Sequence, residues 1–292
     1  MDDFFVTARS LSKSFGRKSV LENLSFDVRP GDVVGVLGKN GAGKTTLLEL
    51  MLGFTPVSSG EVKVFGHDSY RLPGAAKARV GFVPQQDELV NQLSVADQLK
   101  LVRSFYKSWD DVLMDRLVHL WEIDPAERVR SLSVGQRQKL SILLSLGHRP
   151  DLLILDEPVA SLDPIARRHF LEQIVEIAAS GNRAVVLSSH IVSDIERLAN
   201  RIWILKDHHL NWHGDFDALK DSIVRLHVRT AAPLPADIQI PNALRVERSA
   251  SGAIVVVRDW GPERESEISR LVGAELEVEP LTLEDIFLEL HR

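Results

Sequence analysis

Residues 38–45 combine glycines, a lysine and a threonine in the spacing of a phosphate-binding loop, GxxxxGK[ST]. The segment is composed of Gly38, Lys39, Asn40, Gly41, Ala42, Gly43, Lys44 and Thr45, with Thr46 directly after it. The glycines let the backbone curl so that successive N–H groups point at phosphate oxygens. In this pattern the lysine reaches the β- and γ-phosphates, and the threonine hydroxyl is a ligand of Mg²⁺. The segment therefore predicts a nucleoside triphosphate site; a glycine-rich turn with a chance lysine is the alternative.

Two neighbouring acids and a histidine follow apolar runs further along the chain. Asp156 and Glu157 come directly after residues 152–155, and His190 comes directly after residues 184–189. We expect Asp156 to support Mg²⁺ and Glu157 to polarise the attacking water as a general base. His190 is a candidate contact for the γ-phosphate. The plainer alternatives are a polar strand end and a structural or solvent-exposed histidine.

These side chains need a parallel sheet to bring them together. Residues 32–37 are a nearly continuous β-branched run before the phosphate loop, and residues 45–52 predict a buried helix after it. Residues 165–179 have helical spacing and precede the strand-like run 184–189. Strands that alternate with helices predict a parallel sheet, whose carboxyl ends meet at one edge where ligands bind.

The remaining segments predict three additions to this core. The first 30 residues alternate apolar and polar positions, which indicates short antiparallel strands, and helical spacing prevails in residues 87–149. Pro233 and Pro235 lie in an Ala/Pro-rich stretch typical of a linker or loop. Beyond it we expect a small α+β tail, with strands at 254–257 and 276–278, a helix from Glu263, and a last helix that Thr282 and Asp285 cap. We therefore expect one domain at 1–220 and a second at 221–292.

Composition excludes several functional classes. The chain has 292 residues, with 35 Lys and Arg against 41 Asp and Glu, and this acidic balance disfavours nucleic acid as the main ligand. The absence of cysteine excludes disulfides and thiolate metal sites. We find no run of about 18 apolar residues and no basic-then-apolar secretion signal at the N-terminus. We therefore expect a cytoplasmic protein that does not cross a membrane by itself.

The segment before the acid pair resembles a family signature. Residues 132–140 read LSVGQRQKL, which is similar to the Leu-Ser-Gly-Gly-Gln motif of the ATP-binding cassette (ABC) ATPases. Ser133, Gly135 and Gln136 match that motif, and Val134 replaces its first glycine. Because a β-branched residue does not readily adopt positive φ, we expect an ordinary backbone at Val134. The resemblance implies that the Ser133 hydroxyl and the Gly135 N–H contact the γ-phosphate of ATP held by an opposite subunit.

Other family positions occur in the correct order over residues 4–219. Phe15 resembles the aromatic residue that stacks on adenine, although a core phenylalanine is the alternative. Gln85 resembles the glutamine that senses Mg²⁺ and the transport partner, with Gln86 as the weaker claimant. Asp163, in the sequence Ser-Leu-Asp, resembles the loop that crosses the dimer interface.

The resemblance implies a fold, cofactors and partners. The fold is α/β, a P-loop NTPase parallel-sheet core with an N-terminal antiparallel β subdomain, a helical insert and a small C-terminal α+β extension. The implied activity is ATP hydrolysis with Mg²⁺ in a dimer with a second copy or a homologous ATPase. The dimer drives a separate membrane permease from the cytoplasmic face of the cell membrane, and the helical insert is the expected coupling surface. Residues 283–287 (LEDIF) resemble the end of ATPases that serve ABC-2 type exporters, although any amphipathic C-terminal helix shows the same pattern.

Two rival functions and one rival site stay open at this point. An ABC ATPase of translation or DNA repair needs no permease, and a regulatory module could keep the fold without useful catalysis. The acidic charge disfavours the first, and the intact set of Lys44, Asp156, Glu157 and His190 disfavours the second. A metal site at His208, His209 and His213 competes with a polar hairpin turn, which we favour because no cysteine or acidic partner is evident.

Overall fold

The computed structural model describes residues 4–230, 234–235 and 238–292, which form two compact units, Met1–His213 and Gly214–Arg292. The division falls seven residues before the expected 220/221 boundary. Helix α8 (Phe216–Ser222) spans the expected position and contacts strand β11 (Ile223–Arg229), which follows it. Of the two linker prolines, Pro235 lies in a loop, and Pro233 lies outside the described residues.

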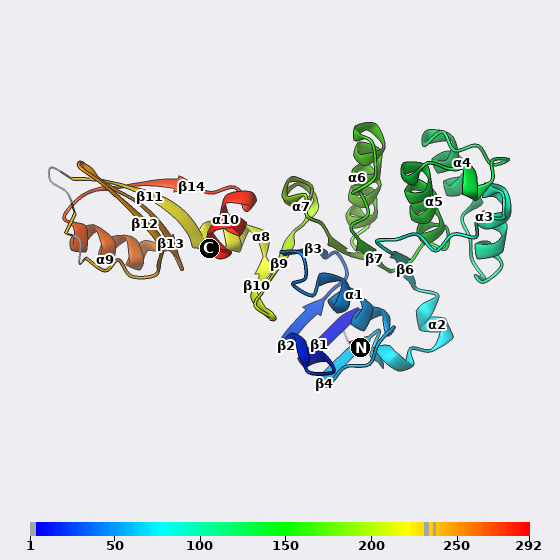
Figure 1. Ribbon diagram of the computed structural model, residues 1–292, viewed down its shortest axis with the longest axis horizontal. Helices are drawn as coiled ribbons and strands as arrows, with labels where there is room; N and C mark the ends of the chain where they lie inside the picture. The colour runs from blue at the N-terminus through cyan, green and yellow to red at the C-terminus, as the bar shows by residue number, and fades with distance from the viewer. Residues whose placement is uncertain (1–3, 231–233, 236–237) are drawn as a thin grey trace. The chain divides into compact units, whose positions relative to one another are not determined.

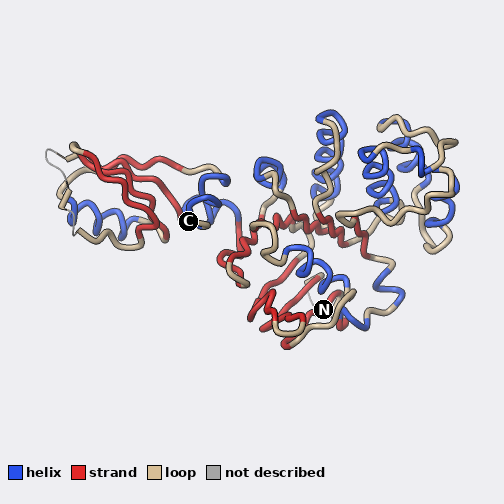
Figure 2. The backbone as a smooth tube through the Cα atoms, in the orientation of Figure 1, coloured by secondary structure: helices blue, strands red, loops and turns tan. Residues whose placement is uncertain are grey.

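A six-stranded sheet is the centre of the first unit (Figures 1 and 2). In spatial order its strands are β10 (His209–Asp215), β9 (Arg201–Lys206), β3 (Val33–Gly38), β8 (Ala184–Ser188), β7 (Leu152–Asp156) and β6 (Val80–Val83). All pairs from β9 to β6 are parallel. Every residue of β3, β7 and β8 is buried, which explains their continuous apolar sequences.

Helices cover both faces of this sheet. Helix α1 (Lys44–Leu52) lies on one face, and α6 (Pro164–Ala179) and α7 (Val192–Leu198) lie on the other (Figure 1). The short helices η1 (Ser69–Arg71) and α2 (Gly74–Lys77) lie between the antiparallel sheet and β6 in the sequence. Trp203 of β9 is fully buried, with its ring centroid 4.4 Å from that of Phe26. The core therefore extends from the central sheet into the N-terminal strands.

A second sheet in the first unit is antiparallel. Its order is β2 (Lys18–Val28), β1 (Val6–Phe15), β4 (Ser59–Val64) and β5 (His67–Asp68). Val6, Ala8 and Leu11 are fully buried, and exposed or half-buried residues separate them along β1. This pattern confirms the predicted N-terminal antiparallel subdomain.

Helices alone make up the segment between β6 and β7, which we call the helical insert. They are α3 (Val95–Arg103), α4 (Asp111–Leu120), η2 (Val129–Ser131) and α5 (Val134–Leu146). Ser94, Asp110 and Ser133 cap three of them, because each side chain accepts a hydrogen bond from an N–H of the first turn. The insert gathers beside β6, which contacts α5 (Figure 1).

The second unit has its own core. Its antiparallel sheet has the order β12 (Ala243–Ser249), β13 (Gly252–Arg258), β11 and β14 (Leu276–Pro280). Helix α9 (Pro262–Val272) packs on the sheet through Ile268 and Val272. Thr282 caps the last helix, α10 (Leu283–Leu290), by accepting from the Asp285 N–H, as its sequence predicted. The fold class is thus the predicted one. In the part of the chain that the structure describes, no helix is long and apolar enough to cross a membrane.

Candidate functional site

The phosphate loop joins the carboxyl end of β3 to the start of α1. Gly41 and Gly43 have φ angles of +82° and +103°, which favour glycine because a β-carbon is strained there. A β-carbon at Gly43 would also lie only 2.8 Å from Leu21 Cδ2. The N-terminus of α1 has no side-chain cap among the described residues. The N–H groups of a helix's first turn point out of its N-terminus, and in the described chain no side-chain cap competes with an anion for them.

Lys44 is the first residue of α1 and is almost fully buried, with 8% of its surface exposed. Its Nζ donates a hydrogen bond of 2.8 Å to the carbonyl oxygen of Gly38, at the other end of the loop. Because an ammonium group has three donors, Lys44 Nζ retains donor capacity for an anion beyond its bond to Gly38. The geometry suits the predicted contact with phosphate oxygens.

Thr45, Asp156 and Ser188 form a chain of hydrogen bonds across three neighbouring elements. The Thr45 hydroxyl donates to Asp156 Oδ2 at 2.7 Å, and the Ser188 hydroxyl donates to Asp156 Oδ1 at 2.6 Å. Only 2% of the Asp156 surface is exposed. A hydroxyl and a carboxylate are the hard oxygen ligands that Mg²⁺ prefers. Two of the three predicted metal ligands, Thr45 and Asp156, therefore lie in direct contact, and their oxygen donors fit this ion; the third, Gln85, lines the same cavity.

Glu157 and His190 are in direct contact. Glu157 Oε2 accepts from the His190 backbone N–H at 3.1 Å and lies 2.7 Å from His190 Nδ1. Glu157 itself has φ +50°, an uncommon value for a residue with a side chain. The hydroxyl of Ser188 accepts from the Glu157 N–H at 3.0 Å and holds this turn. Ser188 thus supports both acids, a role that its place in an apolar run did not reveal.

A cavity of about 480 Å³ opens over this edge of the sheet. Ten predicted site residues line it: Phe15, Asn40, Gly41, Gly43, Lys44, Thr45, Thr46, Gln85, Asp156 and Glu157. The remaining lining residues, which sequence reasoning missed, are Lys18, Ser19, Val20 and His208. Gly38, Ala42 and His190 are not among the lining residues, although Gly38 and His190 bond to residues that are.

Phe15 lies at the rim of this cavity at the end of β1. Its ring is 51% exposed, and Lys13 Nζ lies 4.6 Å from the ring centroid. An exposed phenylalanine at a cavity rim does not serve as a core residue, the alternative that the sequence left open. Its open ring face is suited to stacking on a planar base.

Ser133, Gly135 and Gln136 begin helix α5, and none of them lines the cavity as the structure describes it. Ser133 and Gln136 form a capping box, in which each side chain accepts from the other residue's N–H. Val134 is the first residue of the helix, so its backbone is ordinary, as expected. Its side chain is 69% exposed. The segment presents its Ser133 and Val134 side chains to the exterior.

Asp163 lies beside this segment. It caps α6 by accepting from the N–H groups of Ile165 and Ala166, and Lys139 of α5 lies 3.4 Å from its carboxylate. The hydrogen bond from Ala166 is the main cause that holds the pKa of Asp163 below its usual value of 3.8. A β-carbon at Gly135 would lie 3.0 Å from the carbonyl oxygen of Ser161. A glycine at position 135 therefore lets the first turn of α5 approach the loop at Ser161 closely.

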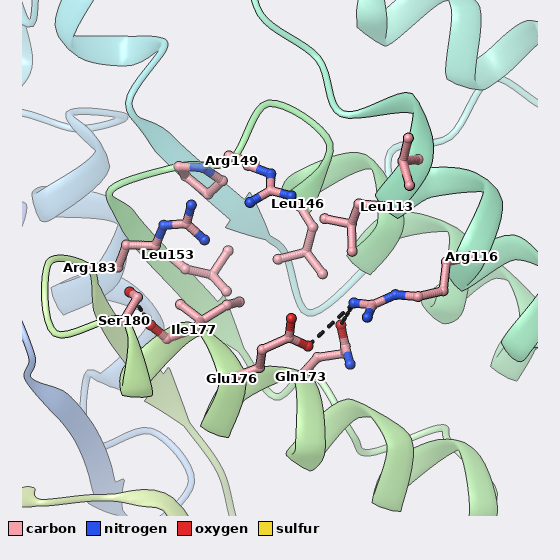
Figure 3. A pocket seen from close by; sticks show the side chains of 12 residues that line it. Leu113, Arg116, Leu146, Arg149, Leu153, Gln173, Glu176, Ile177, Ser180 and Arg183 are labelled. Atoms are coloured by element: carbon pink, nitrogen blue, oxygen red, sulfur yellow. Dashed lines mark hydrogen bonds and ion pairs between the residues drawn. The ribbon is translucent and has the colours of Figure 1, made fainter.

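A second cavity, of about 340 Å³, lies between α4, the end of α5 and α6 (Figure 3). Leu113, Leu146 and Ile177 are among its apolar lining residues, and Arg116 contacts Gln173 and Glu176 across it. None of the predicted site residues lines this cavity in the described chain.

The histidine-rich turn forms a hairpin. His208 Nδ1 lies 3.2 Å from the Val20 carbonyl oxygen, and His209 Nδ1 lies 2.9 Å from the Glu22 carbonyl oxygen. Within residues 4–230, 234–235 and 238–292, no group of three or more His, Cys, Asp or Glu side chains could hold a metal ion. The segment is thus the turn between β9 and β10 with part of β10, and the Glu22 carboxylate, an acidic neighbour that the sequence did not reveal, lies 3.6 Å from His209 Nε2.

Comparison with known proteins places these features in one family. A family model described as "ABC transporter" matches residues 21–160. The chain is 28% identical to the ABC transporter ATP-binding protein YtrB of Bacillus subtilis, over 97% of both proteins. It is 32% identical to the Nod factor export ATP-binding protein I of Cupriavidus metallidurans, over 97% of this chain and 95% of that protein. The solved ATP-binding subunit of an ABC transporter superposes with a TM-score of 0.68 at 26% identity, covering 74% of this chain and 92% of that one.

Proposed function

This chain belongs to the ABC transporter family of ATP-binding proteins and is an ATPase, and we propose that it drives a separate membrane permease, as part of an exporter. The observation that carries the proposal is the unbroken set of contacts from Thr45 through Asp156 and Ser188 to Glu157 and His190. This set lies at one edge of the central sheet and brings the proposed Mg²⁺ ligands Thr45 and Asp156 together with the proposed general base Glu157.

ATP binds with its phosphates in the loop at 38–45 and its base against Phe15. The free N–H groups at the start of α1 and the Lys44 ammonium neutralise the phosphate charge. Thr45, Asp156 and Gln85 would hold Mg²⁺, which would supply further neutralisation of the phosphate charge. Phe15 and the residues of the phosphate loop line the same cavity, so one nucleotide can contact both.

Each ATP-binding site is completed by residues of a second copy of the chain or of a homologous ATPase. Ser133, Gly135 and Gln136 lie outside the chain's own cavity, and the Ser133 side chain is exposed. A helix N-terminus with an exposed serine hydroxyl is a suitable donor group for a γ-phosphate on a facing subunit. Asp163 lies beside it at the same surface. Two chains therefore enclose two ATP molecules, and the γ-phosphates hold the dimer together.

Hydrolysis begins when Glu157 accepts a proton from the attacking water. His190 orients the Glu157 carboxylate through its Nδ1 and backbone N–H, which leaves Nε2 as the ring nitrogen available to the γ-phosphate. Gln85, in the cavity wall, senses Mg²⁺ and the transport partner. Loss of the γ-phosphate removes the charge that both subunits bind, and the dimer opens.

The opening movement acts on a permease at the cytoplasmic face of the cell membrane. The helical insert, with Gln85 at its edge, is the proposed coupling surface. The 32% identity to an export ATP-binding protein over nearly the whole chain supports the export direction and an ABC-2 type partner. Helix α10 (Leu283–Leu290) contains residues 283–287, whose sequence resembles the end of ATPases that serve ABC-2 type exporters.

The Glu157→Gln variant tests the ATPase assignment. It keeps the shape of the side chain but removes the base, so we expect turnover to fall about 100-fold or more while ATP still binds. ATP should then trap a dimer, detected by light scattering during gel filtration. The control is Glu172→Gln, whose exposed carboxylate pairs only with Arg168 on the surface of α6. Parental turnover in Glu157→Gln would refute the assignment of the base.

Copurification tests the permease. A tagged full chain should bring down a protein with several membrane spans from detergent-solubilised membranes of its host. Transport by the reconstituted complex from the ATP-accessible side to the other side would support export. Transport in the opposite direction would overturn that part of the proposal.

A further inference from the structure

Arg137 joins two segments of the helical insert through all three of its guanidinium nitrogens. Its Nε donates to Asp87 Oδ2 at 2.9 Å, and its Nη2 donates to Asp87 Oδ1. Its Nη1 donates to Asn91 Oδ1 at 2.8 Å and to the Val129 carbonyl at 3.1 Å. About one fifth of each side chain in the Asp87–Arg137 pair is exposed. A half-buried, bidentate arginine–carboxylate pair fixes relative orientation as well as distance.

The two ends of this ion pair are next to the two halves of the proposed ATP site. Asp87 is two residues after Gln85, which lines the chain's own nucleotide cavity. Arg137 directly follows Gln136 in the first turn of α5, the segment proposed to cover ATP on the other subunit. The pair therefore connects the cavity wall of one ATP site to the cover of the other.

We propose that the Asp87–Arg137 pair is a positioning device that transmits nucleotide binding at Gln85 to residues 133–136, and so couples the two ATP sites of the dimer. The proposal rests on the function proposed above. A shift of the Gln85 segment toward a bound γ-phosphate moves Asp87, and the bidentate pair makes the first turn of α5 follow.

Neighbouring contacts make this connection stiff. The Val129 N–H donates to the Leu93 carbonyl at 2.9 Å, and the Val90 N–H donates to the side chain of Gln98, which is 4% exposed. These hydrogen bonds hold the segments on both sides of the ion pair against one another.

Arg116 makes a comparable contact in the same insert, but this contact does not join the Gln85 segment to α5. Arg116 of α4 donates to Gln173 Oε1 at 3.1 Å and to Glu176 Oε2 at 3.3 Å (Figure 3). These bonds also join the insert to the core, but they lie at the second cavity and touch neither Gln85 nor α5. Arg116→Ala is thus a control for a general loosening of the insert.

Hydrogen–deuterium exchange of the full chain can test the coupling directly. The chain is kept dilute enough to remain monomeric, which light scattering checks, and is compared with and without Mg²⁺ and the ATP analogue AMP-PNP. In the parental chain we expect slower exchange with nucleotide both in residues 38–46 and in residues 131–137. In Asp87→Asn and in Arg137→Gln, residues 38–46 should still respond, while the nucleotide-dependent change in residues 131–137 is lost.

The controls separate transmission from structural support. Arg116→Ala should keep both responses, and the exchanged pair Asp87→Arg with Arg137→Asp should restore the second one. In a Glu157→Gln background, Asp87→Asn should raise the ATP-dependent dimer dissociation constant by about tenfold. If residues 131–137 respond to nucleotide as strongly in Asp87→Asn as in the parental chain, or do not respond in the parental chain, the inference is wrong. Absence of any response in residues 38–46 of the parental chain would instead overturn the proposed function, and the inference with it.

Discussion

Ser188 contacts both site acids with one hydroxyl group. It donates to Asp156 Oδ1 at 2.6 Å and accepts from the Glu157 N–H at 3.0 Å, and its side chain is fully buried. Without the hydroxyl, a buried carboxylate oxygen and a buried N–H each lose a partner. Both acids would then be free to leave the geometry that hydrolysis needs.

We therefore expect Ser188→Ala to destabilise the fold by about 1–3 kcal/mol, the usual cost of an unsatisfied buried polar group. Turnover should fall at least tenfold, with little change in nucleotide affinity, because the phosphate loop is untouched. Urea unfolding and steady-state hydrolysis measure the two effects. The control is Ser189→Ala, which removes only a hydrogen bond from the Ile191 N–H and contacts neither acid. Normal turnover in Ser188→Ala would show that Ser188 does not position the acids.

At the scale of elements, the end of α5 depends on a close approach to the loop before α4. A β-carbon at Gly147 would lie 2.2 Å from Trp109 Cζ2, and the Gly147 carbonyl accepts from the Asp110 N–H at 2.8 Å. Gly147→Ala forces the indole ring away and strains that hydrogen bond, so we expect a loss of about 1–3 kcal/mol in the free energy of unfolding. At Gly74 no atom lies within 4 Å of an added β-carbon, and Gly74→Ala should not destabilise the fold. Thermal unfolding compares the two variants, and equal stabilities would contradict the packing argument.

His148, directly after this glycine, makes the same junction sensitive to pH. Its ring stacks on Tyr106 at 4.0 Å, and its Nε2 lies 3.1 Å from the Val80 carbonyl oxygen. Burial lowers the pKa of His148 below its ordinary value of 6.5, and the bond to Val80 offsets part of this shift. The unfolded chain therefore binds a proton at His148 more readily than the folded chain does.

This difference makes the free energy of unfolding depend on pH. The contribution of neutral His148 is complete above pH 6.5, and it is lost as the pH falls from 6.5 through the lower pKa that His148 has in the folded chain.

Urea unfolding between pH 5 and pH 7.5 tests this dependence. The parental chain should lose more stability on acidification than His148→Gln, which cannot gain a charge at this position. Because the other histidines titrate in both proteins, the difference between the two curves isolates His148. Parallel curves would contradict the assigned pKa direction.

The elements that the sequence predicted are those with strong periodicity or with a cap. Strands β3, β7 and β8 are buried on both faces, so their apolar runs are continuous and easily recognised. Several strands were not predicted, and for two of them, β6 and β12, the structure gives a physical reason. Strand β6 is a four-residue edge strand that contains a glycine, and no residue of β12 is buried. Half-exposed strands carry little hydrophobic pattern, and only their neighbours define them.

At the scale of the whole molecule, the site itself was only partly visible in the sequence. The loop and the acids form local motifs, whereas Lys18 and His208, which also line the cavity, come from opposite ends of the first unit's sequence. The Glu22 N–H donates to the His208 carbonyl at 2.8 Å, a tertiary contact that no local pattern encodes. Conversely, the motif at 133–136 was recognised, but its distance from the chain's own cavity required the three-dimensional structure.

Charge is unevenly divided along the chain. Residues 1–213 contain 26 basic residues (Lys and Arg) and 26 acidic residues (Asp and Glu). Residues 214–292 contain 9 basic and 15 acidic residues. The unit with the ATP site is therefore neutral, and the whole negative excess lies in the second unit. Neither balance provides the positive field that concentrates a protein on nucleic acid. This argues against the rival in which the ATPase acts on ribosomes or DNA.

We accordingly expect no measurable binding of a labelled 20-base-pair DNA duplex or of ribosomes at 150 mM salt, with or without ATP, as judged by fluorescence anisotropy and sedimentation. The strongest local exception is the open cavity lined by Lys100, Arg103 and Lys107 beside Tyr106 and Trp109. Arg103 is already paired with Asp111 at 2.8 Å, which leaves two lysines as the main attraction. Any weak binding at 20 mM salt should therefore disappear in the Lys100→Glu, Lys107→Glu double variant. Binding that persists at 150 mM salt and falls steeply with further salt would mean that phosphate contacts outweigh the net charge, and would favour the nucleic-acid rival over the transporter subunit.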